Sequence, residues 1–144
     1  MSADVVIVRT GIANLASVVA GFVRAGATPR LTDDPAEVVA AGHAVLPGVG
    51  AFGAAMELLA PTGLGGAVAE RIAAGRPTLC VCLGLQLLFR ESEESPGVHG
   101  LGVIDGVVNR FSGAAGVRVP QLGWIRVEPS AGCRLLEPGH AYFA

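Results

Sequence analysis

Short apolar runs rich in β-branched residues alternate along the chain with segments of helical periodicity. The first run, VVIV at residues 5–8, is followed by apolar residues spaced three or four apart: Leu15, Val18, Val19, Phe22 and Val23. A short apolar run predicts a buried strand, and this spacing predicts an amphipathic helix. Because strands that alternate with helices form βαβ units, we expect a mostly parallel sheet with right-handed crossovers.

The same reading, continued along the chain, predicts one α/β domain over residues 1–144. Strands are expected at 5–8, 28–32, 43–46, 78–81, 105–111, 124–127 and 141–143. Helices are expected at 15–25, from 35 onward, at 52–59, at 64–74 and at 83–91. We therefore expect three layers, with helices on both faces of the sheet.

The composition favours a buried sheet over a membrane span. Apolar residues make up 51% of the chain, and the mean hydropathy is +0.57. The longest uncharged stretch, 38–56, contains Pro47 and several glycines, whereas a spanning helix needs about 20 mainly apolar residues. A parallel sheet covered on both faces produces the same apolar runs. The net charge of −2 also argues against binding to nucleic acid, so we expect neither a membrane nor a nucleic-acid partner.

The cysteine content and the N-terminus predict a cytoplasmic protein with reduced thiols. The chain has three cysteines, Cys80, Cys82 and Cys133, an odd number that does not suggest a framework of disulfides. The first apolar run follows Met-Ser-Ala-Asp at once and is too short for a signal peptide.

The segment 78–86 carries the strongest chemical signal, because an expected strand ends at Cys82 and an expected helix begins directly after it. A nucleophile occupies this turn in many α/β enzymes. A helix N-terminus favours thiolate over thiol, and the N–H of Leu83 is placed to hold an oxyanion. Gly84 allows close approach of a substrate or strand, and Gln86 can bind a polar substrate.

Two alternatives remain open for these cysteines. A free cysteine often does no more than pack in the core. A metal site made by Cys80 and Cys82 is the other alternative, but no histidine or second cysteine pair lies nearby in the sequence. We therefore expect no metal.

A glycine-rich loop at 46–52 also follows an expected strand and precedes an expected helix. Ligands of open parallel sheets bind beyond the carboxyl ends of the strands, so this loop and the Cys82 turn can face each other. The loop lacks the Lys-Ser/Thr of a phosphate loop and the spacing of a dinucleotide fingerprint. A transient oxyanion is therefore a better ligand than a nucleotide, and a plain glycine turn is the alternative.

Together the two loops resemble those of class I (triad-type) glutamine amidotransferases. The sharper similarity is to the glutaminase subunit of imidazole glycerol phosphate synthase, from histidine biosynthesis. Segments that match it span 5–143 and include 10–18, 46–51, 82–88, 92–95, 100–104 and 119–124. Pro-Gly-Val-Gly at 47–50 and Pro-x-x-Gly-Trp at 120–124 narrow the resemblance to this subunit.

The resemblance implies a flavodoxin-like fold and a role for each matching residue. Cys82 would form a γ-glutamyl thioester, and the N–H groups of Val49 and Leu83 would hold the oxyanion. Gly50 would shape the oxyanion strand, and Gly48 and Gln86 would contact the glutamine.

The resemblance also implies a partner. Asn14 and Trp124 would face a cyclase subunit, a (β/α)₈ barrel, in a heterodimer. That subunit would use the ammonia to make imidazole glycerol phosphate and AICAR. No cofactor is implied.

Three positions depart from the family pattern. Arg9 stands where an acidic residue is usual, Cys80 where a glycine is common, and Gln121 where a histidine is usual. None of the three is expected to take part in the chemistry.

The family's catalytic histidine and glutamate lie in a His-Pro-Glu-like motif beyond a segment such as 141–143. His43, His99 and His140 do not stand in that motif. The sequence therefore predicts a nucleophile without its general base, in a chain truncated at its C-terminus. The alternatives are a subunit that only docks a partner, or a triad amidotransferase of the anthranilate or guanylate branch.

Overall fold

The computed structural model describes residues 3–113 and 118–143, which fall into two units. Contacts within the chain separate Met1–Arg110 from Phe111–Ala144, and each unit is described by itself. The single domain expected over 1–144 stays a prediction.

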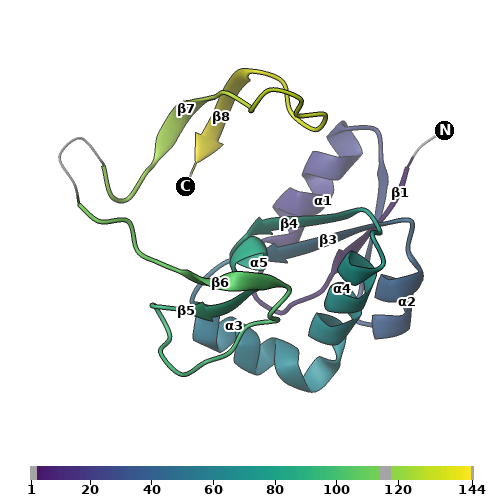
Figure 1. Ribbon diagram of the computed structural model, residues 1–144. Helices are drawn as coiled ribbons and strands as arrows, with labels where there is room; N and C mark the ends of the chain where they lie inside the picture. The colour runs from purple at the N-terminus through teal and green to yellow at the C-terminus, as the bar shows by residue number, and fades with distance from the viewer. Residues whose placement is uncertain (1–2, 114–117, 144) are drawn as a thin grey trace. The chain divides into compact units, whose positions relative to one another are not determined.

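A four-stranded parallel sheet lies at the centre of the first unit (Figure 1). Its strands are β1 (Asp4–Val8), β2 (Thr28–Thr32), β3 (His43–Gly48) and β4 (Thr78–Cys82), in the order β2-β1-β3-β4. All three strand pairs are parallel, as the alternation of strands and helices predicts. β3 and β4 extend beyond their expected ends because Pro47 pairs with Val81 and Gly48 with Cys82.

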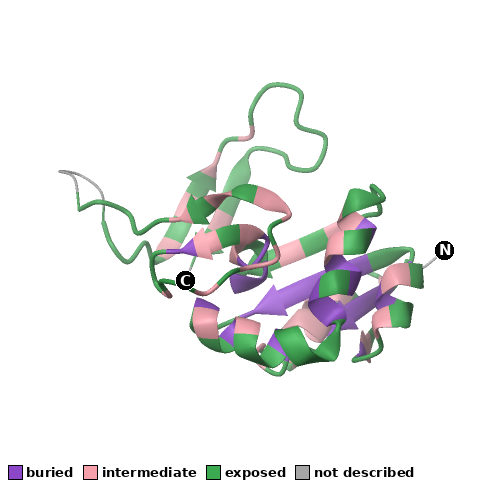
Figure 2. Ribbon diagram, turned by 60° about the horizontal axis from the view of Figure 1, so that its bottom comes forward, coloured by how far each residue is buried: buried purple, intermediate pink, exposed green. Residues whose placement is uncertain are grey.

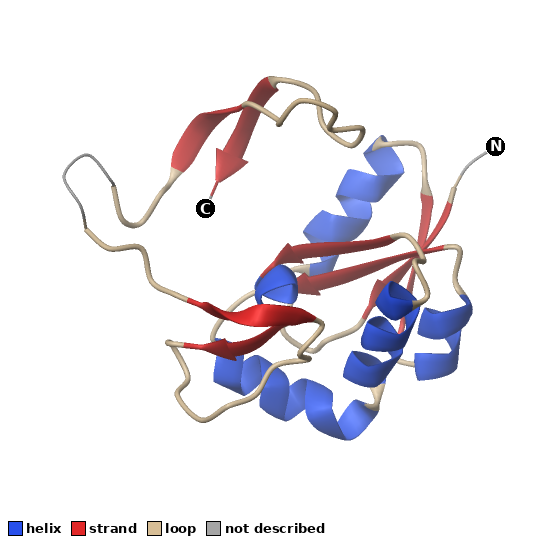
Figure 3. Cartoon of the chain, in the orientation of Figure 1, coloured by secondary structure: helices blue, strands red, loops and turns tan. Residues whose placement is uncertain are grey.

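Helices cover both faces of this sheet, which confirms the three-layer α/β prediction (Figure 3). They are α1 (Leu15–Arg24), α2 (Pro35–Ala40), α3 (Phe52–Leu59) and α4 (Leu64–Ala73), with the 3-10 turn η1 (Ala60–Thr62) between the last two. α1 packs on one face, against Val5, Ile7 and Val45. α2, α3 and α4 bury the opposite face, and the middle of the sheet is the most buried part of the unit (Figure 2).

Polar side chains cap the N-termini of two of these helices. The Asn14 side chain accepts a hydrogen bond from the Ser17 N–H at 3.3 Å, at the N-terminus of α1. The Asp34 side chain accepts one from the Ala36 N–H at 2.8 Å, and Pro35 occupies the first position of α2. Both side chains satisfy N–H groups that a helix leaves unpaired at its N-terminus.

The helix expected at 83–91 is wrong. The structure has the one-turn helix α5 (Leu83–Gln86), then β5 (Phe89–Ser92), which pairs in parallel with β6 (Ile104–Val108). The carbonyls of Leu87 and Leu88 accept hydrogen bonds from the N–H groups of Leu101 and Ile104, at 2.8 and 2.9 Å. Leu83, Leu87 and Leu88 are buried, but burial alone does not separate a helix from a turn followed by a strand.

The second unit contains an antiparallel pair, β7 (Gly123–Val127) and β8 (Gly139–Phe143). Trp124 lies opposite Tyr142, and their rings meet edge to face with centroids 5.7 Å apart. Within the described ranges no single helix is long and apolar enough to cross a membrane. In the same ranges, one helix pair, Phe52–Thr62 and Leu64–Ala73, is together long and apolar enough for a membrane span, but the pair is bent by 89°.

Arg71 is a fully buried cation at the amino-terminal end of the sheet. Its guanidinium donates to the carbonyls of Val38, Ala41 and Pro77 and to the Thr78 hydroxyl. Burial, and secondarily the charge of Arg76, lowers the pKa of Arg71. The side chain thereby joins the C-terminus of α2 to the start of β4, because helix C-terminal carbonyls attract a cation.

We expect Arg71→Met to lower the free energy of unfolding by about 3 kcal/mol, because it leaves several buried carbonyls without donors. Urea denaturation followed by circular dichroism measures this change. Arg76→Met is the matched control, since Arg76 is exposed and its guanidinium donates to the Ala40 carbonyl at 3.3 Å. A loss in Arg71→Met no larger than in the control would contradict the role of Arg71.

Candidate active site

Cys82 sits at the junction of β4 and α5 in a backbone conformation that side chains rarely adopt. Its φ is 55° and its ψ is −119°, and it is the one non-glycine residue with positive φ in the part of the chain that the structure describes. Such strain persists only where the surrounding structure enforces it, and it concentrates at functional sites. Cys82 is exposed, so this turn presents a thiol at the carboxyl end of the sheet, where ligands of such sheets bind.

Two glycines hold the turn in place by allowing a very close approach between β3 and α5. A Cβ added at Gly84 would lie 2.1 Å from the Leu46 carbonyl oxygen. A Cβ added at Gly48 would lie 2.9 Å from the Gly84 nitrogen. Gly48, expected to contact substrate, is thus buried under the turn, and its substrate role stays a prediction.

The predicted oxyanion donors come from the two chain segments that meet here. Leu83 is the first residue of α5, so its N–H has no acceptor within the helix. The Val49 N–H instead donates to the Ile12 carbonyl at 2.8 Å. Gly50 follows with a φ of 96°. Because α5 has one turn, the electrostatic help for a thiolate is local and smaller than the expected longer helix would give.

A cavity of about 600 Å³ opens beside the turn, within the first unit. Gly50 and Gln86, both expected in the site from sequence, contribute to its wall. The rest of the wall comes from β5, β6 and the residues that follow them: Ser92, Glu93, Glu94, Val108, Asn109 and Arg110. The structure therefore adds a set of charged residues to the site, to which the sequence reading gave no role.

Glu94 is fixed in this wall by a helix N-terminus. Its carboxylate accepts a hydrogen bond from the Phe52 N–H at 3.0 Å, and the Ser95 hydroxyl accepts one from the Gly53 N–H at 3.0 Å. Both bonds cap α3, where carboxylates are favoured. In the sequence, the block Ser-Glu-Glu-Ser at 92–95 was the one feature that could have indicated a role for Glu94. Its place in the same cavity wall as Gln86 follows from the pairing of β5 with β6.

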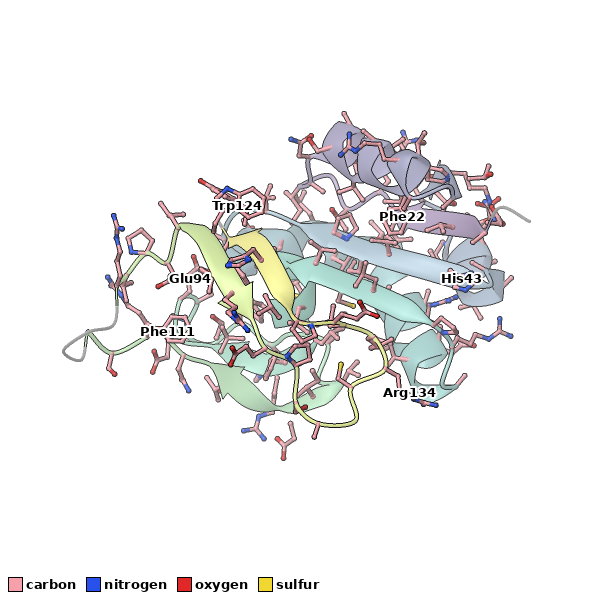
Figure 4. The ribbon with its side chains drawn as sticks, turned by 90° about the horizontal axis from the view of Figure 1, so that it is seen from above. Phe22, His43, Glu94, Phe111, Trp124 and Arg134 are labelled. Carbon is pink, nitrogen blue, oxygen red and sulfur yellow. The ribbon has the colours of Figure 1, made fainter. Side chains whose placement is uncertain are left out.

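The remaining predicted residues lie elsewhere in their units. Asn14 is exposed and caps α1, and Trp124 is 73% exposed on β7. His43 starts β3, so it lies about 16 Å along the strand from Gly48, the residue that pairs with Cys82. Figure 4 shows His43 and Glu94 at opposite ends of the sheet. The His99 ring lies 3.9 Å from the Glu91 carboxylate and is largely exposed.

The two cysteines of β4 differ in environment. Cys80 is half-buried against the core that α3 and α4 cover, and this burial raises its pKa to about 11. Cys82 is exposed. Cys80 therefore stays a protonated thiol at neutral pH and is a poor nucleophile, because the thiolate is the reactive form.

Comparisons with known proteins give one consistent result. The chain is 48% identical over 127 residues to "Imidazole glycerol phosphate synthase subunit HisH" of Symbiobacterium thermophilum, covering 88% of this chain and 59% of that protein. It is 41% identical over 144 residues to the protein of that name in Deinococcus radiodurans, covering 97% and 67%. It is 40% identical over 136 residues to "Imidazole glycerol phosphate synthase hisHF, chloroplastic" of Arabidopsis thaliana, covering 92% and 23%.

This chain spans about three fifths of the length of the first relatives that it matches. No family model matches it.

The contact between β3 and α5 predicts opposite effects for two glycine substitutions. Gly84→Ala should lower the free energy of unfolding by about 2 kcal/mol, because its Cβ would collide with backbone. Gly66→Ala, where nothing lies within 4 Å in α4, should raise it by up to about 1 kcal/mol. Urea unfolding of both variants measures the difference. Equal stability of the two would argue against the close contact.

The thiols should also differ in alkylation. At pH 8, iodoacetamide should modify Cys82 and Cys133, which are exposed, and leave Cys80 unmodified. Because its pKa is raised to about 11, Cys80 should react only as the pH approaches that value. Peptide mass mapping checks the sites, and guanidinium-unfolded protein, in which all three react, is the control. Early modification of Cys80 in folded protein would contradict its burial.

Proposed function

The chain belongs to the family of the imidazole glycerol phosphate synthase subunit HisH, and on that premise we propose that it hydrolyses glutamine through a thioester on Cys82. The observation that carries the proposal is the strained conformation of Cys82, at the end of a parallel strand and next to the cavity that Gln86 lines. An exposed thiol in such a turn is suited to nucleophilic attack on an acyl group.

The reaction would proceed in two balanced steps. The Cys82 thiolate attacks the carboxamide carbon, the C–N bond breaks with proton transfer to nitrogen, and ammonia leaves. Water then attacks the γ-glutamyl thioester, the C–S bond breaks with proton transfer to sulfur, and glutamate leaves while the Cys82 thiol is restored. The N–H of Leu83 would stabilise the negative oxygen in both steps. Val49 would join it by exchanging its bond to the Ile12 carbonyl for one to the oxyanion, with Gly50 as the flexible neighbour.

Both steps need a general base. His43 lies at the far end of the sheet, and His99 is not part of the cavity wall. His140 lies on β8, in the second unit. We infer that the base and its carboxylate come from the part of the relatives' length that these 144 residues do not cover.

We propose that this additional sequence packs along the outer edge of β4. β4 pairs only with β3 among the described strands, and Leu79 and Val81 on it are 52% and 38% exposed. A strand that pairs in parallel with this edge would end beside Cys82, since carboxyl ends of parallel strands share one edge of the sheet. Its following loop would then reach the thiol.

We further propose that the ammonia passes to a cyclase subunit, a (β/α)₈ barrel, in the cytoplasm. The Arabidopsis relative supports a physical association, because the matched segment is only 23% of its length. Asn14 and the exposed Trp124 are the proposed contacts, since exposed aromatic residues are enriched in interfaces. A compartment that keeps thiols reduced is required for a Cys82 nucleophile.

Covalent labelling with the diazo ketone analogue of glutamine tests the proposal. We expect one label on Cys82, located by peptide mass mapping and lost in Cys82→Ser. The label should form with a rate that saturates with reagent concentration, as binding in a cavity requires. Absence of label, with the cyclase subunit of a relative present, would instead favour a subunit that only docks its partner.

A further inference from the structure

The cavity beside Cys82 has one positively charged residue in its wall. Its charged members are Glu93, Glu94 and Arg110, and its polar neutral members are Gln86, Ser92 and Asn109. We propose that Arg110 is a specificity-determining residue that binds the α-carboxylate of the substrate. The inference rests on the proposed function, because it takes glutamine as the occupant of this cavity.

The position of Arg110 is fixed by its backbone. The Arg110 N–H donates to the Glu93 carboxylate at 2.9 Å, and the Glu93 N–H donates to the Val108 carbonyl at 3.0 Å. These two bonds tie the residues after β6 to those after β5, on one side of the cavity. The segment that bears Arg110 is therefore held in the wall without using its side chain.

The guanidinium of Arg110 is available for a ligand. It forms no hydrogen bond or ion pair with any residue of the described ranges 3–113 and 118–143. Arg90, on the neighbouring strand, differs in this respect, since its guanidinium lies 3.0 Å from the Asp105 carboxylate. Arg110 is therefore the one cationic residue in a wall that also contains the carboxylates of Glu93 and Glu94.

The chemistry of the substrate requires such a position. Free glutamine carries an ammonium and a carboxylate on its α-carbon and a neutral carboxamide at the other end. With the carboxamide at Cys82, the α-carbon groups would extend into the cavity that Gln86 lines. Carboxylates such as Glu94 attract the ammonium and repel the α-carboxylate. A guanidinium binds a carboxylate through two parallel N–H donors, which also fixes its orientation.

The pairing distinguishes glutamine from amides without the amino-acid head group. A charge-assisted hydrogen bond typically contributes enough to change affinity by roughly 10- to 100-fold. Loss of the guanidinium should therefore weaken binding of reagents that carry the α-carboxylate by about that factor. Reagents without it should be unaffected.

Labelling of Cys82 separates these effects in the 144-residue chain, alone and with the cyclase subunit of a relative. In Arg110→Gln, the diazo ketone analogue of glutamine should need about 10- to 100-fold higher concentration for half-maximal labelling rate. Its decarboxylated counterpart should label both proteins alike. Iodoacetamide, which has no head group, should react with Cys82 at the same rate in both. Arg110→Lys should recover part of the loss.

Arg90→Gln is the matched control, because it removes one exposed arginine of the same strand pair outside the cavity wall. It should label as the unaltered chain does. The inference is overturned if Arg110→Gln leaves the saturation concentration unchanged, or if it weakens labelling by the decarboxylated reagent equally. An unaltered chain that the analogue does not label contradicts the proposed function itself, which is a distinct result.

Discussion

The close approach of β3 to α5 is the contact on which the site depends. Gly84 lies so near the Leu46 carbonyl that no side chain fits between them, and a side chain at Gly48 would press against the Gly84 nitrogen. This contact leaves the chain little room to turn from β4 into α5. Cys82 therefore takes a positive φ that an L residue normally avoids. The strain at the nucleophile is thus supported by the burial of its neighbours Leu83 and Gly84.

The opposite end of the sheet is held by a different interaction. The Arg71 guanidinium donates hydrogen bonds to carbonyls at the end of α2 and just before β4. These carbonyl dipoles stabilise its charge, and it has no carboxylate partner among the described side chains. Because β4 is an edge strand with a half-exposed face, this fixed start helps define its register on β3. Register matters here, since a slip of one residue would move Cys82 away from Gly48.

The sequence was sufficient for the layers and for the nucleophile turn, because both depend on local patterns. Apolar runs marked β1–β4, and apolar residues at helical spacing marked α1, as the structure confirms. The expected helix at 83–91 failed because buried leucines fit two local structures equally well. The cavity wall that contains Glu93, Glu94 and Arg110 could not be predicted from the sequence, for another reason. It exists only through the pairing of β5 with β6, a contact between residues distant in sequence.

Cys80, which departs from the family pattern, shows that the backbone strain of the turn is confined to Cys82. A glycine is common at this position in the family. Cys80 instead lies within β4, opposite Leu46, and packs against the core. The positive φ falls on Cys82, two residues later. The same burial that accommodates the Cys80 side chain raises the pKa of its thiol. The two thiols of β4 therefore differ in exposure, and the exposed Cys82 is the one suited to the proposed thioester.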